Sequence, residues 1–271
     1  MQKNNAKKKN ALKPIYKPYL TGKAFSSLAL KRGLKVLGLL LVFAFFGILA
    51  SGVFSFENPI PRILLNGALL FFGCMVMFNE GSRIGENDVS YAEIALKRQN
   101  EGLAVTDTDR QICYHRLKGF VSALAGAAPL LLITVIYALT VQRQTMSLGA
   151  LPSWVQGYEN QDEIGQALAF YHESSAAGFT DFLRLAVRLV LFPYMNMIGA
   201  GNFDRLYLLD RLSPLLVLII PLCYGVGYLR GPYLRALVHG NIRMARRRHN
   251  RSERKAREQR VRKQPQKKEL I

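Results

Sequence analysis

The sequence predicts an all-α protein: a multi-pass transmembrane helical bundle of about four spans, with one further interfacial or re-entrant helix. Half of the 271 residues are hydrophobic, and the mean hydropathy is positive although 37 residues are Lys or Arg. Apolar and charged residues must therefore occupy separate parts of the chain. They do, because four long uncharged runs alternate with segments rich in charge.

The four runs predict spans at 36–54, 60–78, 119–141 and 214–230. The first contains nineteen residues without a charge from Val36 onwards, or about 28 Å of helix at 1.5 Å per residue. That length matches the hydrocarbon core of a bilayer, which is about 30 Å thick. The long basic leader before this run argues against a cleaved signal peptide.

The distribution of positive charge predicts the orientation. Residues 1–35 carry ten Lys or Arg and no acid, the module 79–118 carries six, and residues 230–271 carry fifteen. Residues 142–213 instead contain five Arg and seven acids. Because Lys and Arg mark the cytoplasmic side, we expect a multi-pass protein of the cell membrane whose two termini and middle module are cytoplasmic. Residues 142–213 form the outer loop.

Within the outer loop, an apolar stretch at about 181–200 resembles a further span. It carries Arg184 and Arg188 one helical turn apart, and a centrally placed Arg costs at least about 2.5–3.5 kcal/mol on insertion scales. A fifth crossing would also place the basic tail outside. We therefore expect an amphipathic or re-entrant helix that ends at Pro193, with five or six spans as the alternatives.

Arg184 and Arg188 are the candidate residues for contact with an anion or a lipid. The first interpretation is that both side chains extend to the outer headgroups and hold the helix parallel to the membrane. The second is that they face a cavity and bind the phosphate of a lipid or an anionic solute, where the planar guanidinium group allows bidentate contact.

The tail, residues 231–271, contains a dense basic cluster. Its central members are Arg246, Arg247, Arg248, Arg251, Arg254 and Lys255. They can serve only to retain this end in the cytoplasm, or they can bind anionic headgroups, where each charge contributes about 1 kcal/mol. Nucleic acid is the least favoured partner, because the basic cluster at 243–268 has no aromatic residue that could stack on bases.

The module 79–118 predicts two short helices. The first has a cap at Asn87 or Asp88 and ends at Gly102. The second starts at the capping-box-like sequence Thr106–Asp109 and continues into the third span. The module is either a simple connector or a docking surface for a cytoplasmic protein. At the start of the third span, Gly119, Ala123 and Ala127 are small residues four positions apart, which predicts close packing on a neighbouring span of the same chain.

No motif of a catalytic, metal or cofactor site is recognisable. The segment YHESS at 171–175 begins like a zinc-protease signature, but the position of the second His is Ala176. We therefore expect no metal and no cofactor. The favoured function is a non-enzymatic accessory or scaffold subunit that presents basic segments to protein partners or anionic lipid.

Two alternatives come from other functional classes. One is a small carrier, or a subunit of a transport complex, in which Arg184 and Arg188 contact an anionic solute. The other is a membrane-bound enzyme that acts on a lipid-linked substrate through His172, Glu173 and Asp181.

Overall fold

A computed structural model of the chain describes residues 14–53, 56, 58–141, 178–199 and 202–263. All regular secondary structure in these residues is helical, and four helices are long and apolar enough to cross a membrane. The predicted all-α bundle with four candidate spans is therefore confirmed. The helices are α1 (Ser27–Val53), α2 (Pro59–Asn100), α3 (Asp107–Ile112), α4 (Lys118–Thr140), α6 (Phe179–Val190), α7 (Phe192–Ile198), α8 (Phe203–Leu229) and α9 (Gly231–Lys263).

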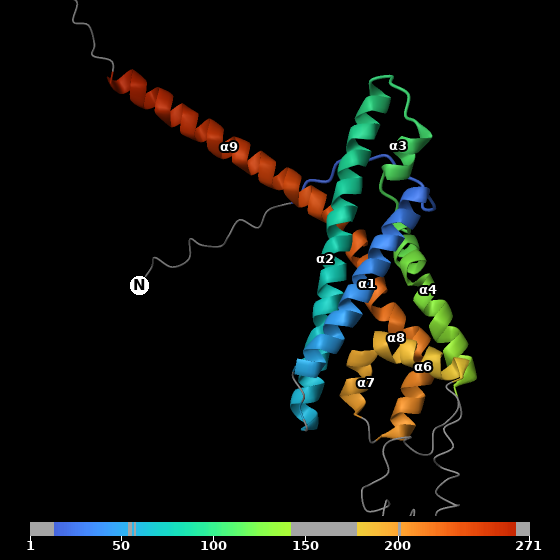
Figure 1. Cartoon of the computed structure of the whole chain (residues 1–271). Helices are drawn as coiled ribbons and strands as arrows, with labels where there is room; N and C mark the ends of the chain where they lie inside the picture. Colours follow the sequence, from blue (N-terminus) through green and yellow to red (C-terminus); the bar gives the residue numbers. More distant parts are fainter. Residues whose placement is uncertain (1–13, 54–55, 57, 142–177, 200–201, 264–271) are drawn as a thin grey trace, which may run out of the picture.

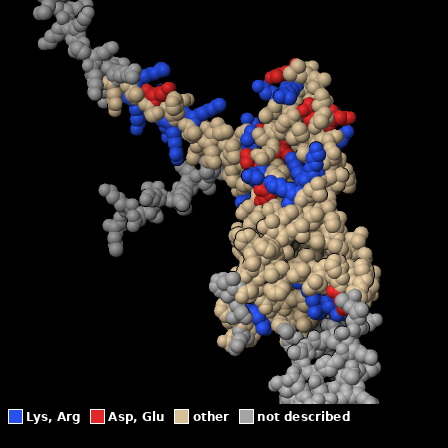
Figure 2. Space-filling view, viewed as in Figure 1, with Lys and Arg blue, Asp and Glu red and all other residues tan. Residues whose placement is uncertain are grey.

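An apolar belt separates two charged regions of the molecule (Figure 2). On α2 the belt lies between Arg62 and Glu80, and on α8 it lies between Arg211 and Arg230. At 1.5 Å per residue these intervals are about 27 and 28 Å, close to the thickness of a hydrocarbon core. We call the region beyond Glu80 and Arg230 the charged end, and the region around α6 the opposite end.

Helix α2 is much longer than the predicted span, because it continues through the belt to Asn100 (Figure 1). Asn87 and Asp88 therefore lie inside the helix and do not cap a new one. No proline interrupts the chain there, and the Asp88 side chain is buried among side chains from other helices. The helix does end where the sequence predicted, before Gly102, whose φ is +80°.

The next two boundaries also differ from the prediction. Thr106 caps α3 in a reciprocal capping box with Asp109, but α3 ends at Ile112 and does not run into α4. Helix α8 starts at Phe203, eleven residues before the expected Pro214. Proline is tolerated inside a membrane helix when neighbouring groups satisfy the freed carbonyl, so Pro214 does not mark a helix start.

Helices α6 and α7 replace the single amphipathic helix predicted at about 181–200. The chain turns at Leu191, and neither piece is a candidate span. Figure 1 shows α6 lying across the bundle at the opposite end. Its residues Leu183 and Val187 are buried against Tyr137 of α4 and Val217 of α8.

Residues 14–26 run as a strap over the charged end. Backbone amides of Ile15, Leu20 and Gly22 donate to carbonyls of Ala236, Ala92 and Tyr114, at 3.0, 3.2 and 2.9 Å. The strap thus joins α9, α2 and the link between α3 and α4. The surface of the module 79–118 is in part covered by the chain's own N-terminal and C-terminal segments.

Candidate functional site

Asp88 of α2 lies at the centre of a buried cluster at the charged end. Arg32 of α1 donates from both terminal nitrogens to its two carboxylate oxygens, at 2.6 and 2.7 Å. Lys118 at the start of α4 donates at 3.0 Å, and the hydroxyl of Tyr228 on α8 donates at 2.6 Å. One carboxylate therefore connects all four candidate spans.

Lys118 is fully buried, and its ammonium group has three acceptors. Besides Asp88, it donates to the carbonyls of Ile112 and Cys113 at 3.0 and 3.2 Å. These carbonyls become free acceptors because α3 stops before α4. A buried charge with every hydrogen bond satisfied is stable only while its partners remain, because removal of one partner leaves an uncompensated charge.

A second charged group attaches the first turns of α9 to α2. Arg235 donates to Glu93 at 3.1 Å, and Nε2 of His239 lies 2.8 Å from the same carboxylate. Arg235 also lies 3.7 Å from Glu86. After His239 and the buried Gly240, almost every described side chain is exposed. Helix α9 is therefore held at its start and projects sideways from the bundle (Figure 1).

The projecting part of α9 is basic on one side. At about 100° per residue, the eight Arg and Lys residues from Arg243 to Arg257 fall within an arc of about 200°. The predicted tail residues Arg246, Arg247, Arg248, Arg251, Arg254 and Lys255 all belong to this arc and are exposed. We call the eight Arg and Lys residues from Arg243 to Arg257 the basic face. The other side of the helix presents Ala245, His249, Ser252 and Ala256.

At the opposite end, each of the predicted anion-contact residues already has a carboxylate partner. Arg188 donates to Asp210 of α8 at 3.0 Å, and Arg184 donates to Asp181 at 3.1 Å. Asp210 is almost fully buried, whereas Asp181 is half exposed. Arg188 therefore fastens α6 to α8, and the pair of Arg184 is the weaker one because exposed ion pairs contribute little.

Several buried polar atoms beside these pairs have no hydrogen-bond partner among the described residues. They are Nε of Arg184 and Arg188, the hydroxyls of Tyr137 and Ser213, and Oδ1 of Asp210. Tyr137 faces Arg184, Arg188 and Asp210 from α4. The polar groups of α4, α6 and α8 thus converge where the apolar belt ends at the opposite end of the molecule.

The first two residues of the small-residue stripe of α4 pack towards α8. Gly119, Ala123 and Ala127 are all buried; a Cβ on Gly119 would meet the side chain of Tyr228, and Ala123 contacts the core around Tyr224. A second close approach was not predicted from the sequence. On α2, a Cβ on Gly81 would collide with the carbonyl of Tyr224 on α8.

Outside the membrane belt, Asp109 is held by local hydrogen bonds. The hydroxyl of Tyr91 donates to it at 2.6 Å and that of Thr106 at 2.7 Å. These donors lower the pKa of Asp109 below its ordinary value. Burial raises the pKa of the neighbouring Cys113 thiol, which disfavours the reactive thiolate.

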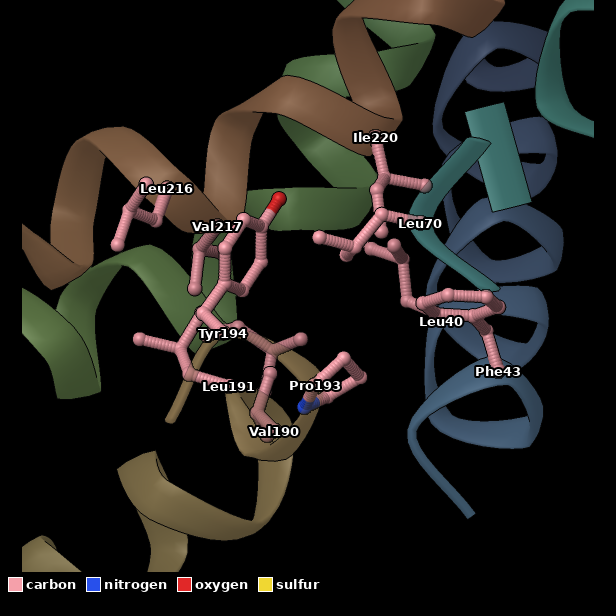
Figure 3. Close-up of a pocket in the computed structure, with 11 residues that line it drawn as sticks. Leu40, Phe43, Leu70, Val190, Leu191, Pro193, Tyr194, Leu216, Val217 and Ile220 are labelled. Carbon is pink, nitrogen blue, oxygen red and sulfur yellow. The ribbon is translucent and has the colours of Figure 1, made fainter. Parts of the chain in front are cut away.

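A small cavity of about 20 Å³ lies between α7 and the spans (Figure 3). Leu40, Phe43 and Leu70 face Val190, Pro193 and Tyr194 across it. It is lined almost entirely by apolar side chains and has room for about one water. It therefore offers no place for a substrate.

Of the three residues in the enzyme hypothesis, only Asp181 belongs to the described part of the chain. Asp181 accepts from the amide of Gly178 at 3.1 Å and pairs with Arg184, so it serves as a helix cap. His172 and Glu173 lie outside the described residues. Within the described ranges, no group of three or more His, Cys, Asp or Glu side chains could hold a metal.

The chain matches no family model, no curated protein and no solved structure in the three comparisons made.

Proposed function

We propose that the chain is a non-enzymatic scaffold of the cell membrane that holds the basic helix α9 against the anionic lipid of the cytoplasmic leaflet. The single observation that carries this proposal is the construction of α9. Its first turns are attached to α2 through Glu93, and the remainder exposes a one-sided basic face. A tail that served only to keep this end of the chain in the cytoplasm would need its positive charge but would not need the attachment of α9 to α2.

The energetics favour binding to a negatively charged surface. Each Lys or Arg near such a leaflet contributes about 1 kcal/mol, so eight residues on one face give strong, salt-sensitive attraction. Helix α9 starts next to Gly85 of α2, just past the apolar belt, and leaves the bundle sideways (Figures 1 and 2). Along its length the helix also rises away from the belt (Figure 1), so the start of the basic face lies nearest the level of the headgroups. The excess of Lys and Arg at this end supports its cytoplasmic orientation.

The full-length protein in lipid nanodiscs tests the proposal. Hydrogen exchange of residues 243–259 is compared between discs of phosphatidylglycerol and discs of phosphatidylcholine, at low and high salt. We expect protection only in phosphatidylglycerol and only at low salt. Gln in place of Arg247, Arg251 and Arg254 should remove the protection, whereas Gln in place of Ser252 and Ala256 on the other side should not.

Equal exchange in both lipids would contradict this function and leave a protein partner or simple retention for the tail. The carrier alternative has less support, because the carboxylates of Asp181 and Asp210 already occupy Arg184 and Arg188. An anionic solute that bound both Arg184 and Arg188 would have to displace both carboxylates from the guanidinium groups.

A further inference from the structure

An open groove in the apolar belt lies between α1, α4 and α6. It has a volume of about 380 Å³, and its walls include Ala44 and Phe45 of α1, Ile133 of α4, and Ala186 and Leu189 of α6. Figure 2 shows a hollow in the apolar belt above a small group of charged side chains. The groove is thus on the membrane-facing surface of the opposite half of the bundle.

The walls suit hydrocarbon and exclude a polar ligand. Thr134 is the one polar residue that lines the groove, and its hydroxyl already donates to the carbonyl of Leu131 at 2.9 Å. Apart from the acceptor lone pairs of this hydroxyl, the lining side chains present no polar group and no charge. An occupant must therefore present an apolar surface along the full groove.

The depth of the groove favours one apolar occupant. The groove lies within the apolar belt, at the level of the hydrocarbon core of a bilayer. A flexible acyl chain can fill the same space. The bilayer supplies such chains at this depth.

Helix α6 also provides a guanidinium group, that of Arg184, for the polar head of a lipid whose acyl chain lies in the groove. Ala186 and Val187 line the groove, and Arg184 lies less than one turn before them on the same helix. Nε of Arg184 is buried and has no partner among the described residues, and Asp181, its ion-pair partner, is half exposed. A phosphate can therefore exchange with Asp181 and accept charge-assisted hydrogen bonds from the guanidinium group.

We propose that this groove binds one phospholipid of the outer leaflet, with an acyl chain between α1, α4 and α6 and its phosphate at Arg184. The lipid fills a space that α6 leaves open, and it replaces the weak exposed pair of Arg184. This site lies at the end of the molecule remote from α9, so lipid binding there does not depend on the function proposed above; only the assignment to the outer leaflet rests on the same orientation.

Native mass spectrometry of the full-length chain, released from detergent after addition of phosphatidylglycerol, tests the site. The wild-type protein should retain one phospholipid. Ala186→Phe fills the groove and should lower the occupancy about tenfold, which corresponds to about 1.4 kcal/mol. Val42→Phe is the matched control, because Val42 is an exposed residue of α1 that does not line the groove, and it should retain the lipid.

A second set of variants tests the contact between the lipid phosphate and Arg184. Arg184→Gln should weaken retention of phosphatidylglycerol while a neutral diacylglycerol is retained as in the wild type, and Arg184→Lys should restore only part of the loss. If Ala186→Phe fails to fold, Ala44→Leu provides a smaller obstruction from α1. Equal lipid retention by the wild type and the folded groove variants would overturn the proposal, and equal retention by Arg184→Gln would overturn the phosphate contact.

Discussion

Asp88 is the residue on which the charged end of the bundle depends most. Its carboxylate accepts from Arg32, Lys118 and Tyr228, which lie on three other helices. Sequence analysis recognised Asp88 only as a possible helix cap. Its partners are 56, 30 and 140 residues away, and a local pattern contains no information on such distant pairing. Lys118 is the last residue of the predicted module 79–118, and the sequence pattern did not indicate its burial, because that burial depends on the break between α3 and α4.

Asp88→Asn should destabilise the protein strongly. The substitution leaves the buried charges of Lys118 and Arg32 without a counter-charge, and such a loss costs about 3–5 kcal/mol. Thermal unfolding in detergent measures the effect. Glu101→Gln is the control, since its pair with Lys97 is 3.6 Å long and exposed and contributes at most about 1 kcal/mol. Equal losses from the two variants would show that the Asp88 cluster is not a structural centre.

The lowered pKa of Asp109 predicts that the stability of α3 depends on pH. Because its folded pKa is lowered by hydrogen bonds from Tyr91 and Thr106, it contributes stability that is present above the unfolded value of about 3.9. This stability is lost as the pH falls through the lower folded pKa. Amide exchange of residues 107–112, corrected for the intrinsic rate, should rise on this acidification. Tyr91→Phe should move the rise to higher pH, and an unchanged profile would contradict the role of this bond.

At the scale of helices, the apolar runs predicted the four spans because a bilayer demands long uncharged helices. The polar extensions were predicted only in part. The sequence predicted a helix from Asn87 or Asp88 to Gly102 but not its continuity with the second span, and it predicted no helix at residues 203–213. The break at Leu191 between α6 and α7 was also missed, because the sequence suggested that the helix would continue as far as Pro193.

The crossing of α2 and α8 depends on Gly81. A Cβ at this position would collide with the backbone carbonyl of Tyr224, which a side-chain rotation cannot relieve. Gly81→Ala should therefore lower the unfolding temperature. Gly67→Ala, on the same helix, meets nothing within 4 Å and should be neutral or stabilising, because Ala is favoured over Gly in a helix by about 1 kcal/mol. Similar effects of the two variants would contradict the close crossing.

At the scale of the whole molecule, two native cysteines report on the packing of distant segments. Cys74 of α2 and Cys223 of α8 pack on the same core cluster and lie close to each other. Mild oxidation of the protein in membranes should therefore cross-link them. After proteolysis between residues 142 and 177, the two fragments should stay joined until reduction. Cys74→Ser supplies the control, and fragments that separate without reductant would mean that α2 and α8 do not meet at this depth.

The central claim is that four spans place the module 79–118 and α9 together in the cytoplasm, with residues 142–177 outside. Single cysteines introduced at Gln99, Asn160 and Gln259 of a cysteine-free variant, treated with an impermeant maleimide in intact cells, test it most directly. We expect labelling at position 160 alone, and labelling of positions 99 and 259 only after the membrane is permeabilised. Labelling of position 259 from outside in intact cells would contradict the four-span topology and the cytoplasmic function proposed for the basic face of α9.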